Sequence, residues 1–221
     1  MIAFGPLPSR RLGQSLGINN IPPKTCTYSC VYCQLGRTIK MQAERRTFYE
    51  PEKVLRDVED KVEAANVAGE RIDYLTFVPD GEPTLDVNLG REIELLRPLG
   101  MPIAAITNAS LIWDEEVRRA LTGADWVSLK VDSILEETWR QVDRPHGRLQ
   151  SAAILDGALE FAEGYQGELV TETMLVEGVN DDAEAIRGVA GLLARLKPAT
   201  AYLAVPTRPP AEDWVQAPRE A

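Results

Sequence analysis

Short apolar runs rich in β-branched and aromatic residues alternate along this chain with longer segments in which apolar residues recur every three or four positions. The short runs predict six β-strands, at Ser15–Asn19, Ile72–Val78, Ile103–Thr107, Trp126–Val131, Leu169–Val176 and Ala201–Val205. The longer segments predict helices, at Pro51–Val67, Val87–Arg97, Asp114–Thr122, Gln150–Ala162 and Asp181–Leu196. Strands that alternate with helices form a parallel sheet wrapped by helices. We therefore predict one α/β domain, either an open doubly wound sheet or a partial barrel.

Polar residues follow every predicted strand. In parallel α/β sheets, the loops beyond the carboxyl ends of the strands carry the ligand sites. In chain order the polar residues are Cys26, Cys30 and Cys33, then Asp80, Gly81 and Glu82, Thr107 and Asn108, Lys130 and Asp132, Glu177, Asn180 and Asp181, and finally Thr207 and Arg208. All of these loops meet at one edge of the sheet, so we expect the active site there.

Composition narrows the class of protein. The chain has 221 residues, of which 44% are apolar and 26% are charged, as in soluble globular proteins. No apolar run approaches the roughly 20 residues of a membrane span, and the first residues lack the apolar stretch of a signal peptide. We therefore expect a cytoplasmic protein without membrane contact. The single histidine, His146, excludes metal sites built from two or more histidines.

Charge is unevenly distributed along the chain. The formal net charge is −10, which disfavours nonspecific binding to nucleic acid or to anionic membranes. Residues 1–50, however, contain seven Lys or Arg and only two Glu. Four of these cations closely follow the cysteines, namely Arg37, Lys40, Arg45 and Arg46. They form either a solvated loop that balances an acidic body or a site for a phosphate or carboxylate group.

The three cysteines share one short segment, with the spacing C-x3-C-x2-C between Cys26 and Cys33. One loop can therefore wrap three thiolates around a single metal centre. A structural zinc site needs a fourth ligand, for which His146 is the candidate, and three buried structural thiols are a further alternative. Three thiolates suit a cubane iron–sulfur cluster that leaves one iron open to an external ligand. An open iron makes a reactive site, and the sequence favours this interpretation.

Three further segments carry recognisable motifs. Asp80-Gly81-Glu82-Pro83 is similar to a glycine–glutamate motif, with Asp80 where a glycine is common, and Thr107-Asn108-Ala109 is similar to a TNG motif. Ser128–Asp132 is similar to a fourth-strand pattern, and Tyr32 is the aromatic residue that often precedes the last cysteine. Together with the cysteines, these segments resemble the radical S-adenosylmethionine (SAM) superfamily. The resemblance implies a partial (β/α)6 radical SAM barrel with a parallel sheet.

The resemblance also implies two cofactors, a [4Fe-4S] cluster and SAM. Cys26, Cys30 and Cys33 would bind three irons, and the fourth iron would chelate the amino and carboxylate groups of SAM. The reduced cluster would cleave SAM to methionine and a 5′-deoxyadenosyl radical, which abstracts hydrogen from a substrate. The implied SAM contacts are Tyr32, Asp80, Gly81, Glu82, Thr107, Asn108, Lys130, Asp132 and Thr173.

Each implied contact has a chemical reason and a structural alternative. Gly81 lets a backbone approach a ligand, and Asp80 and Glu82 offer acceptors to the methionine ammonium, although Asp-Gly is also an ordinary turn signal. Thr107 and Asn108 can bond ribose or carboxylate groups or can cap a helix. Lys130, in a mostly apolar strand, requires an anion. Tyr32 can stack on adenine or simply pack. The alternation around Thr171 and Thr173 predicts that both face the barrel interior.

A narrower resemblance is carried by Gly5–Gly13, by Pro22–Cys26 and by Val205–Pro210. These segments look like the branch of iron–sulfur oxidoreductases related to wyosine synthase, whose enzymes modify a guanosine of phenylalanine tRNA with SAM and pyruvate. Those enzymes bind a second cluster through extra N-terminal cysteines. This chain has only three cysteines, so it cannot form that second cluster. The substrate therefore does not follow from the resemblance.

Three functions remain open at this point. The first is a radical SAM enzyme that acts on tRNA or on a nucleoside-like small molecule, and the second is an activase or peptide-modifying enzyme whose substrate is a protein. The third is a non-catalytic iron–sulfur or zinc protein, which would have no use for Gly81-Glu82 and Thr107-Asn108. For an enzyme we expect a flavodoxin- or ferredoxin-type electron donor and a monomer.

The end of the chain differs from the rest in composition. Residues after Trp214 are rich in Pro, Ala and Glu, which resembles a linker. We therefore expect a core domain at residues 1–210 and a tail or linker at residues 211–221. Relatives often continue further, so we expect a substrate-contacting segment to lie beyond it. Three further groups are candidate substrate contacts: Arg208 after the last strand, Arg10 and Arg11 near the start, and the Arg144–Arg148 segment around His146.

Overall fold

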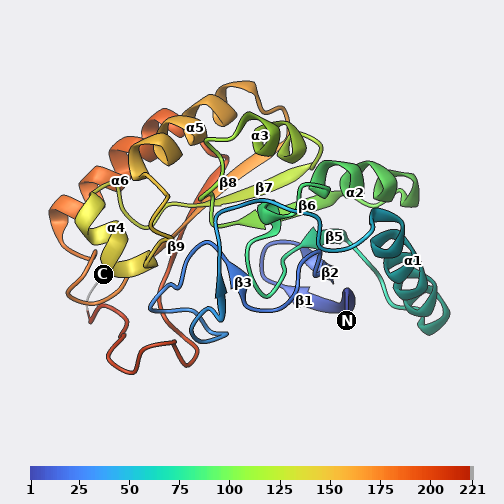
Figure 1. Cartoon of the computed structure of the whole chain (residues 1–221). Helices are drawn as coiled ribbons and strands as arrows, with labels where there is room; N and C mark the ends of the chain where they lie inside the picture. The colour runs from blue at the N-terminus through green and yellow to red at the C-terminus, as the bar shows by residue number, and fades with distance from the viewer. Residues whose placement is uncertain (220–221) are drawn as a thin grey trace.

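A computed structural model of the chain describes residues 1–219, and its centre is a seven-stranded sheet with the order β1-β2-β5-β6-β7-β8-β9 (Figure 1). The strands are β1 (Ala3–Ser9), β2 (Gly13–Ile18), β5 (Tyr74–Phe77), β6 (Ile103–Thr107), β7 (Trp126–Lys130), β8 (Glu168–Met174) and β9 (Thr200–Ala204). From β2 to β9 every neighbouring pair is parallel. These are the six predicted strands. The sheet curves without closing, so the predicted partial barrel is confirmed.

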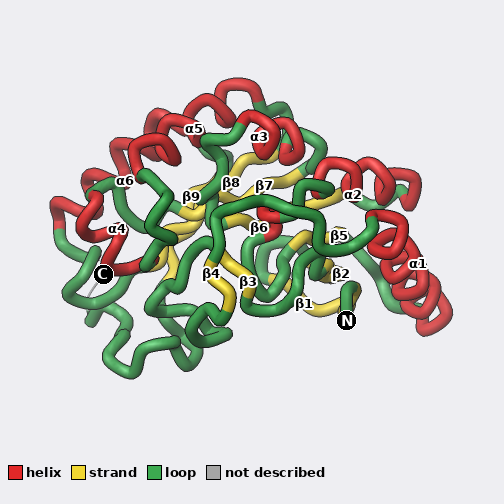
Figure 2. Tube along the Cα trace, in the orientation of Figure 1, coloured by secondary structure: helices red, strands yellow, loops and turns green. Residues whose placement is uncertain are grey.

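Six helices cover the outer side of the sheet, and the long loops lie together on its inner side (Figure 2). The helices are α1 (Pro51–Ala68), α2 (Leu89–Leu96), α3 (Glu115–Leu121), α4 (Glu136–Asp143), α5 (Ser151–Gly164) and α6 (Ala183–Leu196). Two short strands, β3 (Thr25–Cys26) and β4 (Lys40–Met41), form a separate parallel pair within the loops. None of the helices in the described part of the chain is long and apolar enough to cross a membrane.

Besides the short strands β3 and β4, the sequence prediction missed one longer strand and one helix. Strand β1 pairs antiparallel with β2 at the edge of the sheet, where its Pro6 and Pro8 are tolerated because an edge strand has one free side. These prolines hid the strand, since proline argues against a central strand. Helix α4 is short, half of its residues are charged, and only Trp139, Val142 and Asp143 are buried. Its pattern of apolar residues was therefore too weak to predict a helix.

The inner, concave side of the sheet has a small apolar core of its own. Leu12, from the turn between β1 and β2, is buried there against Trp126 of β7 and Val170 of β8, beside Ala104 of β6. The turn of the hairpin therefore fills the barrel interior from the amino ends of the strands. The carboxyl ends remain free to form a site, as parallel α/β sheets require.

Strand β8 corrects one prediction about its threonines. Thr173 donates a hydrogen bond to the carbonyl of Val131 (2.7 Å) and borders an apolar cavity with Ile186 of α6. Thr171 and Thr173 therefore face the outer helices, and the prediction that they face the barrel interior is wrong. Side chains alternate along a strand, so Glu172 takes the inward position instead.

The segment predicted as a tail or linker packs on the cysteine loop. The amide of Glu212 donates to the carbonyl of Val31 (3.1 Å), and Val215 is buried beside Val31 and Val176. Residues 220–221 of the predicted tail lie outside the described residues. The domain boundary at residue 210 stays a prediction, but residues just beyond it belong to the same packed unit.

Candidate active site

The three cysteines open on one cavity at the carboxyl edge of the sheet. All three are half-buried, and none forms a disulfide. Cys26 belongs to β3, while Cys30 and Cys33 lie on the loop that follows it. They line a cavity of about 110 Å³ that is also bordered by Asp80 and Gly81 from the loop after β5. The motif after the first predicted strand and the motif after the second therefore meet, as the sequence predicts.

Backbone hydrogen bonds from α4 hold the cysteine loop in place. The amide of Val31 donates to the carbonyl of Val142 (2.9 Å), and the amide of Ser29 donates to the carbonyl of Asp143 (3.0 Å). The thiol of Cys30 donates to the carboxylate of Asp143 (3.2 Å). The loop is therefore ordered by the protein itself, through the helix that the sequence analysis missed.

The donor set fits a cluster better than a single ion. Among the described residues, no three or more His, Cys, Asp or Glu side chains form a group that could hold one metal ion. The amide of His146 donates to the carbonyl of Thr27 (2.8 Å), and its Nδ1 accepts a bond from the amide of Arg148 (3.3 Å), but His146 is not part of the lining of the cysteine cavity. A cubane cluster is larger than one ion and takes its sulfur ligands further apart. Three thiols around a cavity meet that requirement, so the arrangement disfavours zinc.

Burial keeps the thiols of Cys26 and Cys30 protonated by raising their pKa values. It raises the pKa of Cys26 to about 12, with a further contribution from the negative charge of Glu82. Burial, followed by the charge of Asp143, also raises the pKa of Cys30 well above its usual value. Thiolates at these positions therefore need a compensating positive centre, which iron would provide.

Gly81 brings the loop after β5 against the cysteine loop. A Cβ atom at this position would lie 2.0 Å from the backbone carbonyl oxygen of Thr25, so no larger residue fits there. The amide of Glu82 donates to the same oxygen (3.2 Å), and the amide of Lys24 donates to the carbonyl of Asp80 (2.6 Å). Gly81 was expected to let the backbone approach a ligand. In the structure, the backbone at Gly81 instead approaches the backbone of Thr25.

The carboxylate of Glu82 is directed into the protein. The residue is 1% exposed. Its Oε1 accepts hydrogen bonds from the hydroxyl groups of Thr84 and Thr107 (2.6 Å each) and from the amide of Thr84 (3.1 Å), and its Oε2 accepts from the amide of Asn108 (2.7 Å). The structure therefore places Glu82 as a link between two loops. Asp80, half-buried at the wall of the cysteine cavity, is the acceptor that faces open space.

Thr107 and Asn108 continue this link toward the cysteines. The amide group of Asn108 donates to the hydroxyl of Thr27 (2.8 Å) and reaches the sulfur of Cys26 (3.5 Å). Ala109 follows with φ of 62°, the left-handed conformation that favours glycine. This explains why the related motif carries glycine at that position.

Lys130 finds its anion within the protein. Its Nζ lies 3.1 Å from Glu172 Oε1 and 3.9 Å from Asp132 Oδ2, and 4.9 Å from the centre of the Tyr32 ring. The hydroxyl of Tyr32 donates to Asp132 and, at 3.2 Å, to Asp143. Burial alone would lower the pKa of Lys130, but Asp132 and Glu172 outweigh it and raise the pKa. Sequence reasoning missed Glu172. The only hint in the sequence was the presence of a charged residue inside a mostly apolar strand.

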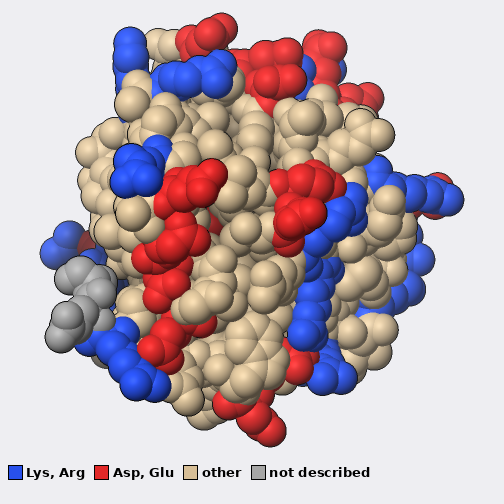
Figure 3. All heavy atoms as spheres, turned by 90° about the vertical axis from the view of Figure 1, so that its left-hand side faces the viewer, with Lys and Arg blue, Asp and Glu red and all other residues tan. Residues whose placement is uncertain are grey.

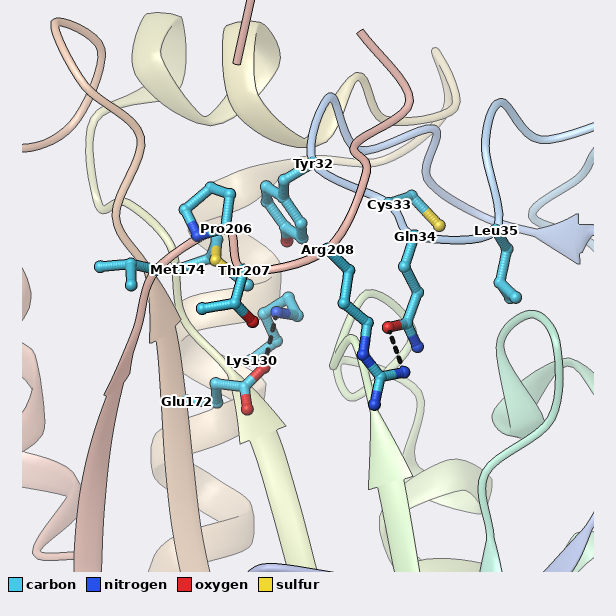
Figure 4. A pocket seen from close by; sticks show the side chains of 11 residues that line it. Tyr32, Cys33, Gln34, Leu35, Lys130, Glu172, Met174, Pro206, Thr207 and Arg208 are labelled. Atoms are coloured by element: carbon cyan, nitrogen blue, oxygen red, sulfur yellow. Dashed lines mark hydrogen bonds and ion pairs between the residues drawn. The ribbon is translucent and has the colours of Figure 1, made fainter. Parts of the chain in front are cut away.

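A second, larger cavity adjoins the cysteine cavity. It measures about 360 Å³ and lies over the carboxyl ends of β7, β8 and β9, and we call it the β7–β9 cavity (Figure 4). Cys33 and Leu35 line both cavities. Lys130 and Glu172 lie at its base, and Thr207 and Arg208 of the segment after β9 lie along its side. A ligand that starts at the cysteines can therefore extend over the carboxyl ends of these three strands.

The cations that follow the cysteines are mostly engaged within the protein. Arg37 donates to Glu212 from Nε (2.8 Å), and Arg144 bonds the same carboxylate. Arg45 donates to the carbonyl of Thr84 (3.0 Å), and its side chain is 10% exposed. These contacts support the interpretation of the cations as balancing charges, and sequence reasoning did not anticipate the role of Glu212.

Comparison with known proteins agrees with this site. A family model described as the radical SAM superfamily matches residues 20–188, which include the cysteine motif and the motifs at residues 80–83, 107–109 and 128–132. The chain belongs to the radical SAM superfamily. Members of the superfamily are enzymes that use SAM in radical chemistry. The superfamily implies a [4Fe-4S] cluster, and the three cysteines with their shared cavity suit such a cluster.

Other known proteins are similar to the chain in sequence or in fold. A UPF0026 protein of Methanocaldococcus jannaschii is 52% identical over 218 residues, covering 99% of this chain and 67% of the relative. A radical SAM methyltransferase from Sphaerobacter thermophilus has a similar fold (TM-score 0.67, 14% identity, 93% of this chain and 60% of that one). So does TYW1 with a lysine–pyruvate adduct bound (TM-score 0.63, 18% identity, 86% and 64%). The chain thus spans about two thirds of the length of these proteins.

Proposed function

We propose that this protein is a radical SAM enzyme in which Cys26, Cys30 and Cys33 hold a [4Fe-4S] cluster. The observation that carries the proposal is that all three thiols open on one cavity together with Asp80 and Gly81. When bound, the cluster and SAM supply a 5′-deoxyadenosyl radical that abstracts a hydrogen atom from the substrate. The residues of the chain bind, orient and shield these groups.

The roles of the SAM contacts follow from where their side chains face. Asp80 offers a carboxylate to the methionine ammonium, and Asn108 offers its side chain beside Cys26. Glu82 and Thr107 act as positioning residues, because their polar atoms bond to each other. Tyr32 borders the end of the β7–β9 cavity next to Cys33, where the adenosyl group lies in this proposal, and Lys130 lies at the base of the cavity, which is left for the substrate. Asp132 fixes Tyr32, and Thr173 has no part, since it faces α6.

The wyosine reaction is not carried over to this chain. TYW1 holds a lysine–pyruvate adduct. Lys130, the lysine of the β7–β9 cavity, is paired with Glu172, and its raised pKa keeps it protonated and therefore not nucleophilic. The three cysteines also leave none for a second cluster. The substrate we propose is a small molecule or a tRNA, with an activase-type protein substrate as the alternative.

The cluster is tested by anaerobic reconstitution with iron and sulfide. We expect about four irons and four sulfides per chain, together with visible absorption that the Cys30→Ala variant loses. Addition of dithionite and SAM should then produce 5′-deoxyadenosine slowly, even without a substrate. A stoichiometric zinc content without inorganic sulfide would contradict the proposal. S-adenosylhomocysteine as the sole product would indicate ordinary methyl transfer instead.

Mobility shift with total tRNA at physiological salt separates tRNA from a protein substrate. The net charge is −10, and on the face of the molecule that carries α4 and α6 acidic and basic side chains form separate strips (Figure 3). We therefore expect weak binding to unrelated RNAs, because broad adhesion needs a continuous basic surface. Submicromolar affinity for unrelated RNAs would contradict this expectation. An electron donor of flavodoxin or ferredoxin type and a monomeric state are further parts of the proposal.

A further inference from the structure

The charges that line the β7–β9 cavity are unlike those of the protein as a whole. Two cations, Lys130 and Arg208, face the cavity, and Glu172 is the one acidic residue in its lining. The whole chain, in contrast, has a formal net charge of −10. An isolated positive cavity in an acidic protein attracts anions, because low-dielectric walls focus the field of the charges that line them.

A third cation, Arg11, offsets the charge of Glu172 from below. It comes from the turn between β1 and β2, where its neighbour Leu12 is buried in the barrel interior. The guanidinium of Arg11 lies 4.2 Å from the centre of the Tyr202 ring and donates to Glu172 Oε2. Glu172 Oε1 accepts from Lys130 at 3.1 Å. Glu172 therefore divides its single negative charge between two cations. Asp132 Oδ2 also lies 3.9 Å from Lys130, so these four groups are together neutral, and Arg208 supplies the positive charge that remains at the cavity.

Two charged donors and one uncharged donor line the same cavity. Figure 4 shows Arg208, Thr207 and Lys130 directed into the same space from different sides. One guanidinium nitrogen of Arg208 donates to Gln34 Oε1 (2.8 Å), which orients the group, and its other N–H donors have no hydrogen-bond partner among the described residues. A planar guanidinium, an ammonium and a hydroxyl form a suitable set for carboxylate or phosphate oxygens.

Size limits what this cavity can hold. Its volume of about 360 Å³ lies at the low end of the range for small-molecule sites, roughly 300–1,000 Å³. We propose that the β7–β9 cavity binds a small substrate through a carboxylate or phosphate group placed between Lys130 and Arg208. Arg11 acts as a positioning residue, because its guanidinium contacts Glu172 and Tyr202 and sets how much of the Lys130 charge is free for the anion. The inference rests on the proposed function for the reaction that follows binding.

Binding of simple anions tests the inference without the reaction. Cluster-loaded protein is titrated with inorganic phosphate, with pyruvate and with succinate, and affinity is measured by calorimetry or ligand-observed NMR. Arg208→Gln should weaken binding at least about tenfold, because it removes a charge-assisted bond at an exposed position. Arg11→Gln should weaken it by a smaller factor, because Glu172 then neutralises Lys130 more completely. Arg56→Gln, the same charge change on the exposed side of α1, should have no effect.

The possible outcomes identify the chemical class of the ligand and distinguish failure of the anion site from failure of the proposed function. Phosphate alone would identify a phosphate-bearing substrate, pyruvate or succinate alone would identify a carboxylate, and both results support the inference. Absence of binding, or equal binding by wild type and Arg208→Gln, would overturn it. Cleavage of SAM to 5′-deoxyadenosine is followed on the same samples. Anion binding without SAM cleavage would contradict the proposed function but not the anion site. SAM cleavage without anion binding would contradict the anion site but not the proposed function.

Discussion

The hydroxyl of Thr107 donates a hydrogen bond of 2.6 Å to the carboxylate of Glu82, and this contact joins the loops that follow β5 and β6. Asn108, the next residue, extends the link to Cys26 on the cysteine loop. Three motifs from three strands are therefore tied into one unit before any cofactor binds. A buried carboxylate with four donors is well suited to this task, because charge-assisted bonds are short and strong.

Replacement of Glu82 by glutamine should reduce the stability of the protein. Burial raises the pKa of Glu82, and the bonds from Thr107, Thr84 and Asn108 act against that rise. A glutamine side chain presents a donor where an acceptor is needed, so the free energy of unfolding should fall by about 1.5–3 kcal/mol. Denaturant unfolding of the cluster-free protein measures this. Glu59→Gln, on the exposed side of α1, should change it by less than about 0.5 kcal/mol. Equal values for the two variants would contradict the link.

Gly81→Ala should destabilise the same unit by a steric route. The added Cβ would lie 2.0 Å from the carbonyl oxygen of Thr25 and 2.9 Å from Ile21, so the two loops must separate. Such overpacking costs about 1–3 kcal/mol, and the cluster should also be lost faster to an iron chelator. The control is Gly191→Ala in α6, where no atom lies within 4 Å of the added Cβ. That control should raise stability by about 0.5–1 kcal/mol, since alanine favours helices. Unchanged melting of Gly81→Ala would refute the close approach.

Glu212 provides a test of the segment that covers the cysteine loop. It binds both Arg37 and Arg144, while its neighbour Asp213 is exposed. Glu212→Gln should therefore increase the rate of trypsin cleavage after Arg37, because the loop loses the ion pairs that hold it to the segment. Asp213→Asn removes the same charge one residue away and should leave the rate near that of wild type. Mass spectrometry of the cleaved cluster-free proteins measures both rates. Similar rates in both variants would show that the ion pairs do not order the loop.

The sequence predicted the six parallel strands because each is a compact apolar run whose period is visible locally. It also predicted the edge of the sheet at which the motifs meet, since that follows from the parallel topology alone. The inward and outward faces of β8 were harder to assign, because Glu172 lies between Thr171 and Thr173 and all three are polar. Side chains alternate between the two faces of a strand, but this alternation does not say which face of β8 is turned toward the barrel interior.

Contacts between distant segments account for most of what sequence reasoning missed. Arg11 meets Glu172 only because the hairpin of β1 and β2 fills the barrel interior, and Pro6 and Pro8 concealed that hairpin. Glu82 turned inward because Thr84 and Thr107 supply donors on its buried side. Both outcomes depend on how loops close in three dimensions, which residue types and spacing do not specify.

Glu92 of α2 is buried without a charge partner, and this makes stability depend on pH. Burial, with a further contribution from Asp86, raises its pKa from 4.5 to about 9. Asn20 donates to Glu92 Oε2 (3.2 Å), while Glu92 Oε1 and Asn20 Oδ1 have no partner among the described residues. A proton on Glu92 supplies a donor where both unpartnered atoms are acceptors, so the folded protein carries this acid in its neutral form.

The sign of the pH dependence follows from proton binding. The unfolded chain loses the Glu92 proton near its ordinary pKa of 4.5, whereas the folded protein keeps it up to about pH 9. The folded state therefore binds more protons between these values, and stability should fall as pH rises through that window. Glu92→Gln stays neutral and should be more stable than wild type near pH 9, with a difference that shrinks toward pH 4.5. Glu94→Gln, exposed on the same helix, should follow the wild-type curve. Unfolding curves measured across this window decide the matter, and parallel curves for wild type and Glu92→Gln would mean that Glu92 ionises in the folded protein.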